Sequence, residues 1–425
     1  MNQPVDLYRV HGQSTVASSA KMLAASTDLF LFGQTPLLIK LLNRIQIGQL
    51  HLTLPNGDER VFRGPQDGIH ADLQIHDLRA FSAISKSADI GLAESYREGW
   101  LDSSDLLALL QLALTNEAAL TAAFKGKWYG KLFYQIKHWQ NRNTKSGSKK
   151  NIHAHYDLGN DFYQLWLDPS MTYSSALFSD DNMTLEQAQT QKYARLFESL
   201  KVQAGDHVLE IGCGWGGFAE YAASRGVRVT GVSLSREQLQ YAHCRLHRLG
   251  LSHLTDLRFQ DYRDIRIEND KPYDAIVSIE MIEAVGESFW PSYFKQLFDL
   301  VKVGGMVSIQ AITIDESRFD SYRVSTDFIQ QYIFPGGMLA SPTRLRQEFE
   351  RVGLTWIDGL SFGHDYARTL YQWRQAFEQH LDQIRTLGFD EGFIRIWRFY
   401  YIYCEAGFLS DRTSVYQVIA QRPTL

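Results

Sequence analysis

The chain has 425 residues, 44% of them hydrophobic and 21% charged, which provides material for buried cores and argues against bulk disorder. At about 150 residues per domain, this length predicts two or three domains. The 43 Lys and Arg nearly balance the 48 Asp and Glu, and a net charge of −5 argues against a nucleic-acid-binding protein. Three cysteines without a CxxC pair argue against a disulfide scaffold or a cysteine zinc cluster, and they fit a reducing cytoplasm.

The most apolar stretch, residues 29–42, is interrupted by Gly33, Pro36 and Lys40. Because a helix needs about 20 consecutive apolar residues to cross a bilayer, the sequence predicts no transmembrane segment. The N-terminus shows no pattern of a secretory signal. Peripheral contact with a membrane is compatible with these features.

Residues 1–140 are predicted to form a small α+β domain. Residues 48–63 alternate apolar and polar side chains around Pro55-Asn56-Gly57-Asp58, which predicts a hairpin because Asn-Gly readily adopts positive φ. A further strand is expected at 71–75. Helical spacing follows at 92–100 and 104–114, with candidate caps at Asp102, Ser103 and Ser104.

Residues 141–151 (NRNTKSGSKKN) are polar and basic and lack apolar periodicity, which predicts a linker. One interpretation is a solvated loop. The alternative is contact with lipid headgroups, which attract each nearby Lys or Arg by about 1 kcal/mol. A second domain is expected to follow over residues 152–425.

This second domain alternates short apolar runs with helical patterns, which is typical of an α/β fold with a doubly wound parallel sheet. Strands are expected at 207–211, 227–232, 274–279 and 306–311, and a helix at 218–223.

The most informative local motif follows the first of these strands. The strand contains the acid Glu210 and leads into Gly212-Cys213-Gly214-Trp215-Gly216. Such a turn lets the backbone approach a ligand closely. The spacing is not the dinucleotide pattern Gly-x-Gly-x-x-Gly, and no P-loop Lys-Ser/Thr follows, so a ligand without phosphates fits better than NAD or ATP. The motif resembles motif I of class I S-adenosylmethionine-dependent methyltransferases.

Polar residues after the next strands extend this predicted cofactor site. The strand at 227–232 leads into Ser233, Leu234 and, four residues on, Gln238. Ser233 and Gln238 would take the place of the acid that often binds ribose hydroxyls at this strand end. Asp261 and Tyr262 follow the next strand and are expected near the adenine.

Residues 152–176 identify a family. They contain HYDLGNDFY, LWLD and MTYSSA, which closely resemble the HYDxGNDFYxLWLD…MTYSCAYF signature of the cyclopropane fatty acid and mycolic acid cyclopropane synthases. Further stretches at 282–286, 334–337, 365–370 and 397–408 are similar to the same family. The resemblance covers roughly residues 150–423, whereas the first ~140 residues resemble the N-terminal extension of the full-length bacterial enzymes less specifically.

The resemblance implies an S-adenosylmethionine site made of Tyr173, Ser174, residues 208–216 and 233–238, Tyr262 and Arg263. It also implies a bicarbonate ion held by the backbone around Ser175 and by Glu283, Gln310 and Tyr366. Cys404 matches a cysteine regarded as the family's active-site residue, although a buried, small hydrophobic role is the commoner one for such a side chain.

The implied reaction transfers a methyl group to the cis double bond of an unsaturated acyl chain in a membrane phospholipid. The carbocation formed must be shielded from water, stabilised by carboxylates or aromatic faces, and deprotonated by a base. Aromatic residues of the C-terminal half are candidates for an acyl tunnel: Phe328, Tyr332, Phe334, Tyr366, Trp373, Phe399, Tyr400 and Tyr403. No metal site is predicted, because His153 and His155 lack a third ligand at a suitable spacing.

Two departures from the family pattern bear on the product. Ser175 stands where the family has Cys, and Gln310 stands where His is expected; a Gln amide can donate a hydrogen bond but cannot accept a proton. Cyclopropane formation is the leading hypothesis, a methyl- or methylene-branched product on the same lipid is the closest alternative, and an inert lipid-binding protein is the third. The family further implies peripheral contact with the inner face of the membrane and a possible homodimer.

Overall fold

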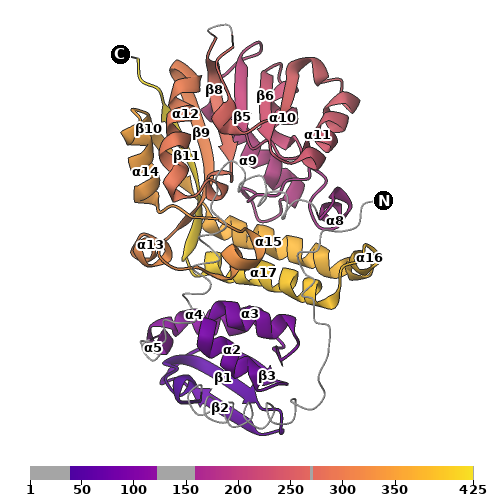
Figure 1. Cartoon of the computed structure of the whole chain (residues 1–425), viewed down its shortest axis with the longest axis vertical. Helices are drawn as coiled ribbons and strands as arrows, with labels where there is room; N and C mark the ends of the chain where they lie inside the picture. Colours follow the sequence, from indigo (N-terminus) through magenta and orange to yellow (C-terminus); the bar gives the residue numbers. More distant parts are fainter. Residues whose placement is uncertain (1–38, 122–157, 269–270, 425) are drawn as a thin grey trace, which may run out of the picture.

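The computed structural model describes residues 39–121, 158–268 and 271–424 (Figure 1). The predicted linker at 141–151 lies outside these ranges, as do His153 and His155. Within the described ranges no helix is both long enough and apolar enough to cross a membrane.

The N-terminal domain contains the predicted hairpin. Strands β1 (Ile47–Thr53) and β2 (Glu59–Arg63) pair antiparallel, and Gly57 in the turn has φ +87°. Strand β3 (Gln66–Ile75) includes the predicted strand at 71–75 and runs parallel to β1, and the short β4 (Leu101–Asp102) completes a sheet of order β2-β1-β3-β4.

The described part of this domain includes the helices α2 (Arg79–Ser87), α3 (Asp89–Arg97), α4 (Leu106–Thr115) and α5 (Glu117–Thr121). The predicted helices at 92–100 and 104–114 correspond to α3 and α4, with shifted ends. The predicted caps Asp102, Ser103 and Ser104 are wrong: Asp105 caps α4, and its carboxylate accepts a hydrogen bond from the Ala108 N–H at 3.0 Å. Ser104 instead donates to the Asp72 carboxylate, which fixes the loop before the helix.

The larger sheet has seven strands in the order β10-β11-β9-β8-β5-β6-β7. Their bounds are β5 (His207–Ile211), β6 (Arg228–Ser233), β7 (Thr255–Phe259), β8 (Tyr273–Ile279), β9 (Val301–Ile314), β10 (Thr355–Ser361) and β11 (Thr413–Gln421). All four predicted strands are present. The expected all-parallel sheet needs one correction, because β11 lies between β9 and β10 and is antiparallel to both.

Helices cover both faces of this sheet, which confirms the doubly wound α/β class. Val208 and Leu209 of β5 are neighbours in sequence, yet they belong to different hydrophobic clusters because strand side chains alternate between faces. One cluster contains α9 (Leu185–Ser199), α10 (Gly217–Ala223) and α11 (Arg236–Arg248), and the other contains α12 (Trp290–Leu300) and α14 (Pro342–Arg351).

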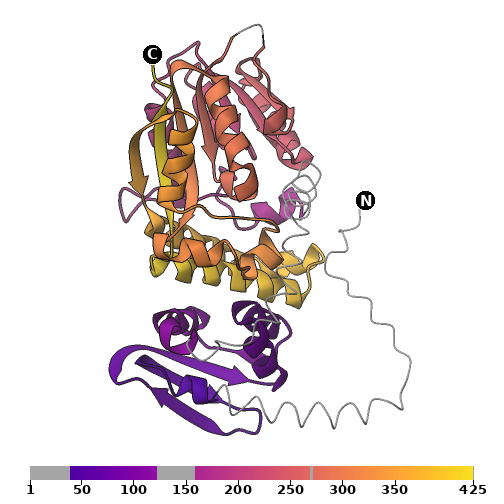
Figure 2. The same cartoon turned by 60° about the vertical axis from the view of Figure 1, so that its left-hand side comes forward.

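The C-terminal helices α15 (Gly363–Gln379), α16 (Leu381–Thr386) and α17 (Glu391–Leu409) lie between this sheet and the N-terminal domain (Figures 1 and 2). Two further helices, α8 (Asn160–Gln164) and α13 (Glu316–Tyr322), complete the α-helices of the described C-terminal part.

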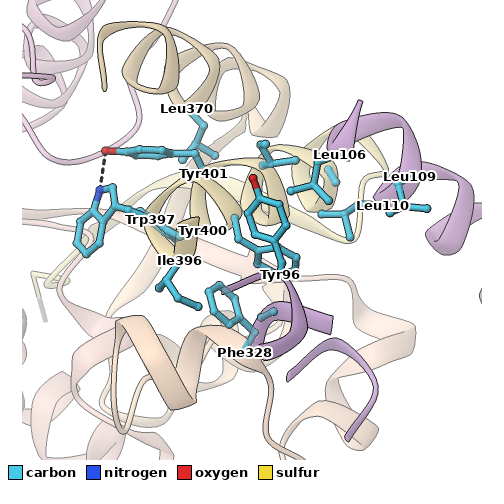
Figure 3. Packing of buried hydrophobic residues seen from close by; sticks show 14 of the residues in the cluster. Tyr96, Leu106, Leu109, Leu110, Phe328, Leu370, Ile396, Trp397, Tyr400 and Tyr401 are labelled. Carbon is cyan, nitrogen blue, oxygen red and sulfur yellow. Dashed lines mark hydrogen bonds between the residues drawn. The ribbon is translucent and has the colours of Figure 1, made fainter. Parts of the chain in front are cut away.

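The two domains share one hydrophobic core. Figure 3 shows Tyr96 of α3 and the leucines of α4 next to Ile396 and Tyr400 of α17. An ion pair of 2.6 Å between Arg395 and Asp102 lies at the same contact, and Arg395 also donates to the Leu101 carbonyl. Residues 39–121 and the C-terminal helices therefore bury one core together, and the division into 1–140 and 152–425 stays a prediction.

Candidate active site

A cavity opens at the carboxyl ends of β5, β6 and β8, the edge at which doubly wound sheets bind ligands. The glycine turn after β5 forms one wall. Gly212 has φ +88°, and a Cβ there would lie 2.9 Å from Met281 Cγ. Gly214 has φ +50°. Both positions favour glycine, and they keep the backbone open to a ligand.

Most of the predicted cofactor residues line this cavity: Tyr173, Ser174, Glu210, Gly212, Gly214, Ser233, Leu234, Gln238 and Tyr262. Three do not. Gly216 begins α10 and packs against Ala242, and Asp261 and Arg263 form an ion pair of 2.6 Å with each other. These three residues were predicted to bind the cofactor, but in the structure they contact neighbouring residues and do not line the cavity.

Glu210 presents a carboxylate to the cavity from the end of the buried strand β5. It is 3% exposed, and within the described part of the chain its Oε2 has no hydrogen-bond partner. Burial raises the pKa of Glu210 well above its ordinary value, and the charge of Lys192 opposes that rise. A buried acceptor without a partner is costly, so this oxygen fits a ligand that brings a donor or a positive charge. S-adenosylmethionine carries both.

Two charged residues of the site were not predicted. Glu280 follows β8 directly and lines the cavity. Lys192 of α9 is fully buried, and its Nζ donates to Ser174 Oγ at 2.6 Å. Burial lowers the pKa of Lys192 to about 7, against the opposing charge of Glu280. The sequence does show Glu280 as an acid at the end of an apolar strand, as it shows Glu210. Nothing in the sequence distinguishes Lys192 from the other residues of an ordinary amphipathic helix.

Three residues predicted to hold bicarbonate all contact Glu280. The Ser175 N–H and Gln310 Nε2 each donate to Glu280 Oε1 at 2.8 Å, and the Tyr366 hydroxyl also hydrogen-bonds the carboxylate. The fourth, Glu283, accepts from the Ile312 N–H instead. These residues therefore do not fit an additional anion, because their donors already serve a carboxylate of the chain.

The glycine turn, the buried acid and the seven-stranded order are features of a class I methyltransferase, and comparison with known proteins agrees. The family described as mycolic acid cyclopropane synthetase matches residues 143–418, more than half of the chain. The chain belongs to this family. It is an S-adenosylmethionine-dependent methyltransferase.

Two relatives and one solved structure place the chain within the mycolic acid cyclopropane synthetase family. The tuberculostearic acid methyltransferase of Mycobacterium tuberculosis is 39% identical over 374 residues, which is 83% of this chain and 84% of the relative. The cyclopropane-fatty-acyl-phospholipid synthase of Escherichia coli K12 is 34% identical over 363 residues, 83% and 88% of the two chains. The mycolic acid cyclopropane synthase CmaA1, solved with SAH and CTAB, is 29% identical with a TM-score of 0.59, covering 64% of this chain and 98% of that one.

The cysteine associated with this family, Cys404, lies on α17 outside the cavity wall. Burial raises the pKa of its thiol, and the nearby charge of Asp327 raises it further. A neutral thiol is a poor nucleophile. Of the two roles that the sequence left open for Cys404, this environment favours packing over catalysis.

Tyr173 of the cavity wall contacts aromatic residues of α15 and α17. The Tyr173 hydroxyl hydrogen-bonds the Tyr400 hydroxyl at 2.9 Å, and the Tyr173 ring lies 5.3 Å from the ring of Trp373. Tyr366 in turn lies 5.9 Å from Trp373. The acyl tunnel stays a prediction; the rings proposed for it belong to one packed cluster, against which Tyr173 of the cavity wall also packs.

Glu283 supports a prediction about pH. Burial, and next the charge of Glu280, raise its pKa to about 8, and its Oε2 has no partner among the described residues. When folding raises the pKa of an acid, that acid does not lower the free energy of unfolding at a pH below its pKa in the unfolded chain. As the pH rises from that value towards its pKa in the folded protein, the free energy of unfolding decreases. We expect Glu283→Gln to gain stability over the wild type as pH increases from about 5 to about 8, and no further above that range.

Urea unfolding of both proteins across this pH range measures the difference. A difference that does not change with pH would show that Glu283 is solvated in the folded protein.

Proposed function

We propose that this enzyme transfers a methyl group from S-adenosylmethionine to the cis double bond of an unsaturated acyl chain in a phospholipid, and that the product is methylene-branched. The observation that carries the proposal is the cavity itself, which combines a cofactor turn, the carboxyl group of Glu280 and aromatic rings in one place. Methylation of an alkene needs all three.

The residues have separable roles in this chemistry. S-adenosylmethionine would supply the electrophilic methyl group, and the alkene would supply the electron pair of the new C–C bond. The methyl–sulfur bond would break in the same step, and S-adenosylhomocysteine would leave with that electron pair. Glu210 and the glycine turn would orient the methyl donor. The faces of Tyr173 and its neighbouring rings would stabilise the carbocation and exclude water. A carboxylate would take the proton that the cation must lose.

The cation has two relevant outcomes. Loss of a proton from the transferred methyl group closes a cyclopropane ring. A hydride shift along the chain before that loss gives a methylene branch. The methyl-branched outcome would need a reductant, which the proposal does not include.

Two findings support the branched product. The tuberculostearic acid methyltransferase is a 39% identical relative, and Gln310 stands where the ring-forming enzymes have His. The 34% identity to the Escherichia coli cyclopropane synthase keeps ring formation as the second candidate.

The proposal includes the place of action. The substrate phospholipid lies in a membrane, so we place the enzyme in the cytoplasm with peripheral contact at the inner membrane face, and we include the homodimer that the family resemblance implies. Cosedimentation of the purified protein with anionic phospholipid vesicles tests the contact, and light scattering tests the dimer.

The product is tested by expression in a bacterium that contains monounsaturated phospholipids and lacks a cyclopropane synthase. Ring and methylene products have the same mass, so proton NMR of the extracted acyl chains must separate them: vinylidene protons support the proposal, and cyclopropane protons support the second candidate. No modified lipid from an expressed, folded protein would contradict both.

A further inference from the structure

Glu280 takes the place that an anion would need. The single N–H of Ser175 donates to Glu280 Oε1, and Gln310 Nε2 divides its two hydrogens between that oxygen at 2.8 Å and the Ser175 carbonyl at 3.1 Å. Neither group has another hydrogen to offer. Bicarbonate at this position would also meet the carboxylates of Glu280 and Glu283 without spare donors to offset the repulsion.

The orientation of Gln310 is fixed from behind. Gln417 of β11 donates its Nε2 to Gln310 Oε1 at 3.0 Å, and Arg195 donates to Gln417 Oε1 at 3.3 Å. Gln310 must therefore point its amino group at Glu280. A histidine would not be needed here for proton uptake if the acceptor were Glu280 itself.

The backbone at Glu280 is also unusual. Its φ of +49° lies in the left-handed region, where a residue with a Cβ costs of order 1 kcal/mol and glycine costs least. A Glu in such a position, with its carboxylate bound by several donors and facing the cofactor cavity, is consistent with a functional constraint on the side chain.

We propose that Glu280 is the catalytic base of this enzyme, a carboxylate built into the chain that takes the position of the bicarbonate ion implied by the family resemblance. The inference rests on the proposed methyl transfer. In the final step Glu280 accepts the proton from the transferred carbon, and the C–H electron pair becomes the new C–C or C=C bond. The resulting carboxylic acid returns the proton to solvent after the product leaves.

The surroundings of Glu280 suit a base. Burial raises its pKa, which makes its carboxylate a stronger proton acceptor than an exposed one, while the charge of Lys192 opposes the shift. The hydrogen bonds from Ser175 and Gln310 hold the acceptor in place.

Removing the side chain should create a bicarbonate site. Glu280→Gly suits the left-handed backbone and frees the Ser175 and Gln310 donors next to Lys192. In buffer depleted of carbon dioxide, with vesicles of monounsaturated phospholipid, we expect the wild type to be unaffected by added bicarbonate. We expect the rate of Glu280→Gly to be about 100-fold or more below that of the wild type. Added bicarbonate should raise the Glu280→Gly rate by about tenfold or more.

Lys201→Gly is the matched control, because Lys201 is an exposed non-glycine residue with φ +53° that does not line the cavity. Its rate should equal that of the wild type. A wild-type rate that depends on bicarbonate, or a Glu280→Gly rate that persists without it, would overturn the proposal.

Binding gives a readout that needs no turnover. Because a ligand of the folded state raises the unfolding temperature, bicarbonate should raise it for Glu280→Gly but not for the wild type, relative to chloride at equal pH and ionic strength. A rise for the wild type, or no rise for Glu280→Gly, would refute the built-in anion. If this pattern holds but the wild type modifies no lipid, the proposed function fails and the assignment of the anion site stands.

Discussion

Replacing Glu210 by Gln is expected to weaken S-adenosylmethionine binding while making the unliganded protein more stable. Glu210 Oε2 is buried without a partner among the described residues, and burial raises the pKa of this carboxyl. The unliganded fold therefore bears the cost of a buried acid, and a neutral amide of the same shape removes it. The ligand, in turn, loses a charged hydrogen-bond acceptor.

The expected size follows from hydrogen bonds to charged groups, which contribute about 1.5–3 kcal/mol. This corresponds to roughly 10- to 100-fold weaker binding, measured by isothermal titration calorimetry. Thermal unfolding of the unliganded protein should show a higher midpoint for Glu210→Gln.

Glu237→Gln is the matched control for this pair of measurements. Glu237 is exposed on α11, close in sequence to the cavity residues Ser233 and Gln238, and its replacement should change neither affinity nor midpoint. Unchanged affinity in Glu210→Gln would show that Glu210 does not contact the cofactor.

The largest loss of stability is expected from Phe162→Ala. Phe162 of α8 is fully buried, and its ring lies within 6.5 Å of six other aromatic rings: Tyr163, Trp166, Phe377, Phe389, Phe393 and Trp397. These rings belong to the segment before the sheet, to the C-terminal helices α15 and α17, and to the connection between α16 and α17. Truncation leaves a cavity where those parts of the chain meet.

We expect Phe162→Ala to lower the free energy of unfolding by about 3–5 kcal/mol, as large-to-small substitutions in cores do. Since whole domains are stable by about 5–15 kcal/mol, much of the folded population would become sensitive to urea and proteases. Tyr371→Ala on α15 is the control, because Tyr371 is 47% exposed and should cost less than about 0.5 kcal/mol. A loss below about 1 kcal/mol for Phe162→Ala would mean that the cluster repacks around the gap.

Features that a short window of residues encodes could be predicted without the structure. Strand β5 was predicted with its observed bounds because its apolar run ends at a glycine turn, and the hairpin of β1 and β2 was predicted because Asn56-Gly57 fits a tight turn. The family signature at residues 152–176 indicated the methyltransferase, and the glycine motif and the polar ends of the next strands indicated cavity residues such as Glu210, Gly212 and Ser233.

Features that depend on residues far apart in the chain required the folded structure. Glu280 meets Ser175, Gln310 and Tyr366 across as many as 105 positions of sequence, and no local pattern reports where those side chains point. The same holds for the antiparallel β11 and for the contact of α3 and α4 with α17. Periodicity tells which face of a helix or strand is buried, but packing decides which partner buries it. For this reason the carboxylate of Glu280 at the predicted anion site became visible only in the folded protein.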